Sequence, residues 1–145
     1  MPRASFTHHV AVPRSVDEIW ERLQVAETWS NIGPVEDVWD AEHTDDGHLQ
    51  RYRWSTTVGP RSYQGRAKVV GSEPGYLMRL DLDATEVAGT LTTRLSENGG
   101  DATQLEVTLE IESRGTLSTL FFPIVSDAVG RGLPAQVERF AESFE

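Results

Sequence analysis

The stretch FTHHVAVPRSVDEIWERL, residues 6–23, decides how the chain begins to fold. Over residues 6–12, apolar side chains and His8 alternate with polar or small ones, which predicts a strand with one buried face. Pro13 ends this strand, and Ser15 with Glu18 three residues later makes a capping box, a common start of a helix. The stretch therefore predicts a strand that leads directly into a short helix.

The C-terminal part of the chain predicts one long apolar helix over residues 117–144. Its apolar side chains recur at helical spacing and fall largely on one face. They are Leu120, Phe121, Ile124, Val125, Ala128, Val129, Val137, Phe140, Ala141 and Phe144. Gly130, Gly132 and Pro134 interrupt the pattern. We expect a kink or break there, because proline removes a backbone hydrogen bond and clashes with the preceding turn.

Six further strands are predicted between these two ends, after a second short helix at residues 25–32. The strands cover residues 35–44, 48–58, 63–71, 76–84, 87–97 and 103–113. The turns between them include Asp45-Asp46-Gly47, Gly59-Pro60, Ser72-Glu73-Pro74-Gly75 and Asn98-Gly99-Gly100. Short turns of this composition favour antiparallel neighbours. The whole pattern predicts a single α+β domain, residues 1–145, in which a curved antiparallel β-sheet of about seven strands wraps around the long C-terminal helix.

Composition narrows the classes of function. The net charge of -10 argues against nucleic acid as a partner, because phosphate binding depends on clustered Lys and Arg. No apolar run approaches the ~20 residues of a membrane span, and the N-terminus lacks the regions of a signal peptide. The absence of cysteine excludes a disulfide scaffold and thiolate chemistry. We expect a cytoplasmic, bacterial protein.

Several segments resemble a known superfamily. HVAVPRSVDEIWERL followed by WSNIGP is similar to the strand–helix–helix opening of START-like helix-grip proteins, the SRPBCC group, which includes polyketide cyclase/dehydrase and lipid-transport proteins. VGPRSYQGRAKVVGSEPGYLMRLDL and AGTLTTRLSENGGDATQLEVTLEIESRGTL look like the carbon monoxide dehydrogenase branch of this superfamily. The resemblance implies a helix-grip fold with a cavity between sheet and helix. The fold hosts carriers, aromatase/cyclases, hormone receptors and chaperone activators, so the function must be argued from the site.

Aromatic side chains predict the walls of such a cavity. Tyr52 and Trp54 project to one face of their strand, whereas Arg51 and Arg53 take the other. If the tyrosine face is concave, the pocket has aromatic walls and a few hydrogen-bonding groups. The alternative is that these rings simply fill the core, and this is favoured for Trp39. The predicted ligand-binding set is His8, Trp29, Trp39, Tyr52, Trp54, Tyr63, Met78, Leu80, Leu91, Ile124, Val125 and Ala128.

Three residues are candidates for acid–base catalysis: His8, Tyr52 and Tyr63. His8 shares the apolar face of its strand, where a lone histidine is more often a hydrogen-bonded core residue than a catalyst. No carboxylate has an obvious inward position from which to orient it.

No metal site and no cofactor are expected. The neighbours His8 and His9 point to opposite faces of a strand, and His43 with His48 lacks a third ligand. The acidic run over residues 36–46 is typical of a solvated or guarded sheet edge. No phosphate-binding loop, dinucleotide fingerprint or serine-hydrolase motif occurs in the sequence.

Three hypotheses of function remain. The leading one is binding of an apolar or aromatic small molecule or lipid in the cavity, for transport, sequestration or presentation. The second is a polyketide cyclase or dehydratase that uses the cavity acid–base groups. The third is an accessory or assembly protein for a partner enzyme, which would carry an exposed apolar patch. A partner protein or a homodimer is compatible with the sequence.

Overall fold

The computed structural model describes residues 3–32, 35–58, 61–84, 87–99, 101–114 and 116–144, with side chains at all of these positions except 31, 32, 58, 61, 116–121, 124 and 125. Strand β1 (Arg3–Val12) is followed by α1 (Val16–Leu23), the short 3-10 helix η1 (Ala26–Thr28) and α2 (Trp29–Ile32). Then come β2 (Asp37–His43), β3 (Leu49–Val58), β4 (Arg61–Glu73), β5 (Leu77–Ala84), β6 (Val87–Glu97) and β7 (Thr103–Ser113). The chain closes on α3 (Thr116–Glu142).

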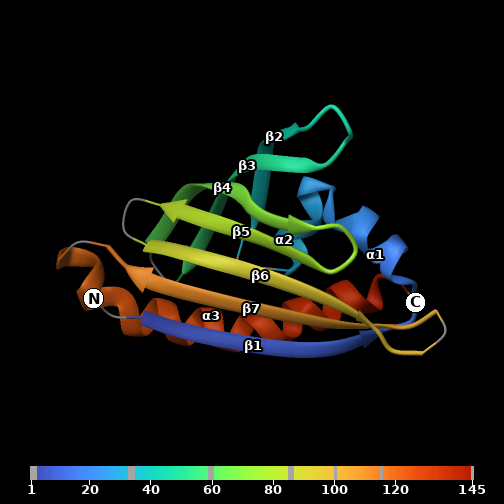
Figure 1. The fold of residues 1–145 in the computed structure, drawn as a ribbon. Helices are drawn as coiled ribbons and strands as arrows, with labels where there is room; N and C mark the ends of the chain where they lie inside the picture. Colours follow the sequence, from blue (N-terminus) through green and yellow to red (C-terminus); the bar gives the residue numbers. More distant parts are fainter. Residues whose placement is uncertain are drawn as a thin grey trace.

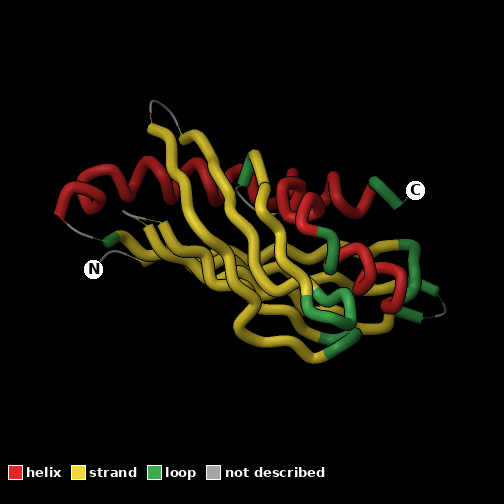
Figure 2. The backbone as a smooth tube through the Cα atoms, turned by 90° about the horizontal axis from the view of Figure 1, so that it is seen from above, coloured by secondary structure: helices red, strands yellow, loops and turns green. Residues whose placement is uncertain are grey.

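All seven strands form one antiparallel sheet in the order β1-β7-β6-β5-β4-β3-β2 (Figure 1). The hairpins from β2 to β7 pair each strand with the next, and β1 pairs with the last strand to form one edge. Seen from above, the strands twist and bend, and α3 runs along one side of the sheet (Figure 2). The predicted α+β helix-grip architecture is confirmed.

Strand boundaries follow the predicted alternation closely, and β6 and β7 have the predicted bounds. The turn glycines Gly47, Gly75 and Gly99 have φ values of 85°, 82° and 80°, which glycine adopts without steric cost. The predicted Gly59-Pro60 turn lies outside the described residues. The acidic strand β2 forms the second edge of the sheet, as its composition indicated, and an irregular register near Asp40 bends it.

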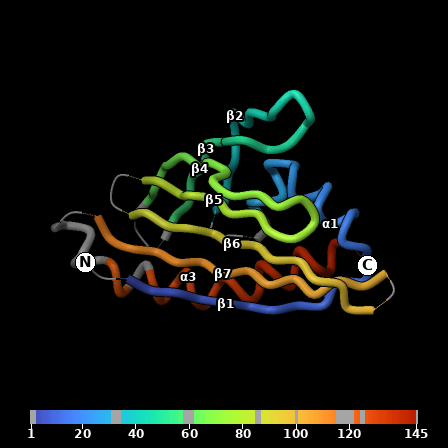
Figure 3. Tube along the Cα trace, in the orientation of Figure 1, coloured from blue at the N-terminus to red at the C-terminus, as the bar shows by residue number. Residues whose placement is uncertain are grey.

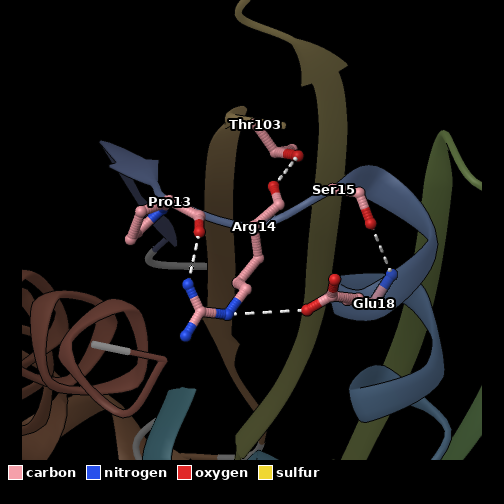
Figure 4. A network of polar contacts seen from close by, with 5 residues as sticks. All are labelled: Pro13, Arg14, Ser15, Glu18 and Thr103. Carbon is pink, nitrogen blue, oxygen red and sulfur yellow. Dashed lines mark hydrogen bonds and ion pairs between the residues drawn. The ribbon is translucent and has the colours of Figure 1, made fainter. Parts of the chain in front are cut away.

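The junction of β1 and α1 is held by polar contacts at both ends (Figure 4). The Ser15 hydroxyl accepts a hydrogen bond from the Glu18 amide at 3.3 Å, which is the predicted N-cap. The Thr103 hydroxyl donates to the Arg14 carbonyl at 2.8 Å, and Arg14 Nε lies 3.5 Å from a Glu18 carboxylate oxygen. The start of β7 therefore fixes the chain where it leaves β1 for α1.

Helix α3 continues through the predicted interruption, so the expected break is wrong. It lies mainly against β1, the strand beneath which it runs in Figure 3. Gly130 is required by this packing, because a Cβ atom there would lie 2.5 Å from the Phe6 ring. Burial of Leu133 and Val137 on either side of Pro134, at 1% and 0% exposure, stabilises the helix where proline weakens it. Tertiary packing outweighs the local propensity here.

The core lies between the sheet and the helices. The inner face of the sheet contributes alternate side chains of its strands, as in β7, where Leu105, Val107 and Leu109 are fully buried. The buried residues of α3 and its C-terminal end are Phe122, Val129, Leu133, Val137, Phe140, Ala141 and Phe144. Phe140 and Phe144 meet edge to face with ring centroids 5.2 Å apart. No helix in the described part of the chain is long and apolar enough to span a membrane.

Candidate ligand pocket

A small pocket lies between the inner face of the sheet and α3, and it encloses about 40 Å³. Its walls are Val35, Trp54, Thr56, Tyr63, Leu82, Val87, Ala88, Gly89, Ile111 and Val129. Most of these side chains are apolar. The volume has room for about one or two water molecules, since a water molecule occupies about 30 Å³ in the liquid. It is smaller than an aromatic ring requires.

Trp54 of β3 forms one aromatic wall of this pocket. Its partner across the strand pair is Gly65 of β4, and a Cβ atom at Gly65 would lie 2.5 Å from Cζ2 of the indole. The indole therefore occupies the space that any side chain at position 65 would fill. Tyr63, two residues before Gly65, pairs with Thr56 and supplies a second ring to the wall. Strand pairing thus gathers these groups in one place.

Two hydrogen-bond donors on the inner face of β3 have no hydrogen-bond partner among the described residues. They are the phenol O–H of Tyr52 and the indole Nε1–H of Trp54. The two residues are only 2% and 6% exposed. Burial raises the pKa of Tyr52 well above its ordinary value of 10.0, so the phenol stays protonated at neutral pH and is a donor, not a base. Buried polar groups in proteins are nearly always hydrogen-bonded, so this pair is unusual.

Four of the predicted ligand-binding residues belong to the tightly packed core. They are Trp29, Met78, Leu80 and Leu91, each at most 1% exposed. Trp29 Nε1 donates to the Leu23 carbonyl at 3.0 Å, so this indole anchors α2 to the end of α1. None of the four is among the described residues that line the pocket.

Two other predicted positions are wrong. Trp39 is 38% exposed and pairs with Arg53, which places its side chain on the outer face of the sheet, away from α3. Ala128 is exposed, whereas its neighbour Val129 is buried and lines the pocket. One residue along a helix turns the side chain by about 100°, so a small error in periodicity selects the wrong side. The side chains of Ile124 and Val125 lie outside the described residues.

His8 lies on the inner side of β1, where α3 runs beside it. Its Nε2 atom is 3.4 Å from Oε1 of Glu138 on α3, a distance suited to an ion pair when the imidazole is protonated. The contact does not have hydrogen-bond geometry, and His8 Nε2 is buried with no hydrogen-bond partner in the described structure. The two side chains are 24% and 58% exposed, so the pair sits at the rim of the sheet–helix interface. Glu138 is the carboxylate that the sequence did not reveal.

The three predicted catalytic candidates lie on different strands. His8 is on edge strand β1, whereas Tyr52 and Tyr63 are on β3 and β4, with β7, β6 and β5 between them in the sheet. Within the described residues, no three His, Asp or Glu side chains gather as a metal site would require. His43 Nε2 instead lies 2.9 Å from the Gln24 carbonyl oxygen.

A larger hollow, about 1370 Å³ in volume, opens on the outer face of the sheet. Charged side chains of both signs line it, and many of them pair with one another. Arg51 Nε lies 3.4 Å from a Glu42 oxygen, and Arg53 Nε lies 3.9 Å from an Asp40 oxygen. All four side chains are more than half exposed, which is typical of a solvated charged face. The inner pocket is therefore the candidate site despite its smaller volume.

Sequence analysis missed most of the aliphatic pocket wall. Leu82, Gly89 and Ile111 form one row across β5, β6 and β7. Register counted outward from the hairpin turns would have aligned them, because strand pairing fixes which residues share a face. The position of Val129 and the approach of Glu138 to His8 depend on how α3 packs on β1, which no turn determines.

No protein-family model matches the chain, and no curated protein matches it. Solved structures do match. Zhui aromatase/cyclase from Streptomyces sp. R1128 has a TM-score of 0.74 at 16% identity, over 99% of this chain and 94% of that chain. A START superfamily protein from Mycobacterium smegmatis has a TM-score of 0.72 at 17% identity, over 96% of this chain and 94% of that chain.

A third similar structure contains small aromatic molecules. Norcoclaurine synthase from Thalictrum flavum, in complex with dopamine and hydroxybenzaldehyde, has a TM-score of 0.65 at 17% identity, over 98% of this chain and 86% of that chain. Identities this low establish a shared fold and not a shared activity. The resemblance to the carbon monoxide dehydrogenase branch stays a prediction. The chain has the START-like helix-grip fold.

Proposed function

We propose that the protein binds an apolar or aromatic small molecule in the pocket between the inner face of the sheet and α3. The wall of this pocket carries the proposal: an indole, a phenol ring and aliphatic side chains surround it. Small-molecule sites in proteins combine such an apolar lining with a few polar groups that fix the orientation of the ligand. The protein would then act by carrying, sequestering or presenting its ligand.

The size of the pocket limits the kind of ligand. A cavity that holds benzene measures about 150 Å³, so a ring-sized ligand must move side chains outward from the present 40 Å³. A compact aromatic compound needs a smaller movement than a phospholipid or a long polyketide chain. The complex of norcoclaurine synthase with dopamine and hydroxybenzaldehyde, a similar fold with two compact aromatic molecules, supports this choice.

Native mass spectrometry after mild purification tests for a natural ligand, and the expected result is a co-purifying small molecule. A titration with an apolar fluorescent amine such as 1-aminoanthracene then locates the site. Trp54→Leu should weaken probe binding, because this ring forms the pocket wall. Trp39→Leu, on the outer face, is the matched control and should bind as wild type does. Unchanged probe affinity in a folded Trp54→Leu protein would contradict the proposal.

A second candidate function is acid–base catalysis, which one contact favours. An imidazole 3.4 Å from a carboxylate, as in His8 and Glu138, is an arrangement that can take up and release a proton. A cyclase or dehydratase acting on a polyketide-like chain would use it, and Zhui aromatase/cyclase has a similar fold. A turnover screen with wild type, His8→Gln and Glu138→Gln tests this function. Loss of a measurable reaction in both variants supports it, and no turnover by wild type rejects it.

A further inference from the structure

We propose that the ligand of the inner pocket carries a neutral hydrogen-bond acceptor of the ketone or aldehyde class, to which Tyr52 and Trp54 donate. This inference rests on the proposed function, because it specifies the ligand of the same pocket. The observation behind it is the pair of buried donors without a partner among the described residues, the phenol O–H and the indole Nε1–H.

The two donors share one face of one strand. They are separated by a single residue in β3, so both side chains project toward α3. Their partners on β4 are small: Ala67 opposite Tyr52 and Gly65 opposite Trp54. These small neighbours give both rings room on the sheet, and at Gly65 the indole occupies the space of the missing side chain. The arrangement is therefore built into the strand pairing.

The missing partners are not a general property of indoles in this fold. Trp29 is equally buried, yet its Nε1 donates to the Leu23 carbonyl at 3.0 Å. Unpaired polar atoms also occur on Thr93 and Gln136, but these residues lie on β6 and α3. A buried donor left without an acceptor is costly, so an acceptor supplied by a ligand would be favoured there. The pair on β3 thus has the character of a binding site for an oxygen atom.

The chemistry of the two donors selects the acceptor. A carbonyl oxygen has two lone pairs and can accept from two donors at once. Neither donor is charged, since Tyr52 stays protonated at neutral pH and an indole only donates. No Lys or Arg occurs among the described residues that line the pocket. A carboxylate would therefore be buried without a counter-charge, which is strongly unfavourable. A neutral carbonyl fits the donors, and a bound water molecule is its natural competitor.

The test uses two probes of nearly equal shape, acetophenone and isopropylbenzene, in which a carbonyl oxygen replaces a methyl group. Their affinities are measured by ligand-detected NMR for wild type, Tyr52→Phe and Trp54→Phe. Each variant should weaken acetophenone about tenfold relative to isopropylbenzene, because only the ketone loses a hydrogen bond. Tyr76→Phe, which removes an exposed phenol at 69% exposure, is the control and should leave the ratio of the two affinities unchanged.

The outcomes separate the two proposals. If both probes bind wild type and neither variant changes the ratio of their affinities, the donor inference is overturned while ligand binding stands. If neither probe binds at millimolar concentration, the proposed function fails for ring-sized ligands, and the inference fails with it. Tyr52→Phe removes only an unpaired hydroxyl, so the fold should persist, and circular dichroism checks this for both variants.

Discussion

The two faces of β3 differ in how their polar groups are satisfied. On the outer face, Arg51 and Arg53 are half exposed, and both pair with acidic residues of β2. On the inner face, Tyr52 and Trp54 are buried, and their polar atoms have no hydrogen-bond partner among the described residues. Water could satisfy the outer groups, yet these have partners, whereas the inner groups lack both. Local rules of protein structure are broken mostly at functional sites, so this difference points to the inner face.

The largest expected effect tests whether the inner face is a genuine packed core. Phe140 is 2% exposed on the side of α3 that faces the sheet. Phe140→Ala should lower the free energy of unfolding by about 3–5 kcal/mol, the usual range for removing a buried ring. Val70→Ala, at a position 47% exposed, is the control and should change it by less than about 0.5 kcal/mol. Equal denaturation midpoints for wild type and Phe140→Ala would show that α3 packs differently.

A glycine pair sharpens the comparison within β4. Gly65→Ala should destabilise the fold by roughly 1–3 kcal/mol, because the new Cβ would lie 2.3 Å from a backbone oxygen and 2.5 Å from the Trp54 ring. Gly71→Ala is the matched control, since its Cβ would meet its nearest neighbour at an ordinary 3.6 Å. Urea unfolding of both variants measures the difference. Equal stabilities would mean that the indole does not lie on Gly65.

The buried phenol predicts a specific dependence of stability on pH. The native protein keeps the Tyr52 proton above pH 10, where the unfolded chain releases it, because burial raises the pKa of Tyr52. The unfolded state then binds fewer protons, so stability falls as pH rises above about 10. The contribution of one group approaches about 1.4 kcal/mol per pH unit. Tyr52→Phe should lose stability less steeply than wild type over this range, and parallel curves would contradict the assigned burial.

The smallest effect is expected on the outer face. Arg53→Gln removes an exposed ion pair with Asp40, whose closest distance is 3.9 Å. Such pairs contribute about 0–1 kcal/mol, and added salt screens them further. The free energy of unfolding and the probe affinity of the pocket should both stay close to wild type. A large loss of probe affinity would move the site to the outer hollow.

Most of the fold could be predicted from the sequence, because alternation and turn glycines act locally. The alternation of β7 gave its buried face, and the capping box at Ser15 gave the start of α1. The continuity of α3 could not be predicted in this way. It depends on Phe6 filling the space beside Gly130 and on burial around Pro134, which are contacts between distant parts of the chain.

The candidate site could be predicted only in part, for the same reason. Parity along β3 placed Tyr52 and Trp54 together on the inner face. The same parity argument was not applied across the β2–β3 pair, so Trp39 was placed on the wrong side. The approach of Glu138 to His8 depends on the position of α3 along β1, and no local pattern in the sequence encodes that position.

The indole N–H signals of the four tryptophans test the central claim most directly, because these residues sample both faces of the sheet. Trp54 lines the inner pocket, Trp39 lies on the outer face, and Trp29 is already bonded to a carbonyl. In a ¹⁵N–¹H spectrum titrated with acetophenone, the account predicts that the Trp54 signal moves most, and downfield, while the Trp39 signal stays in place. A stationary Trp54 signal beside a moving Trp39 signal, or no movement at all, would contradict the account.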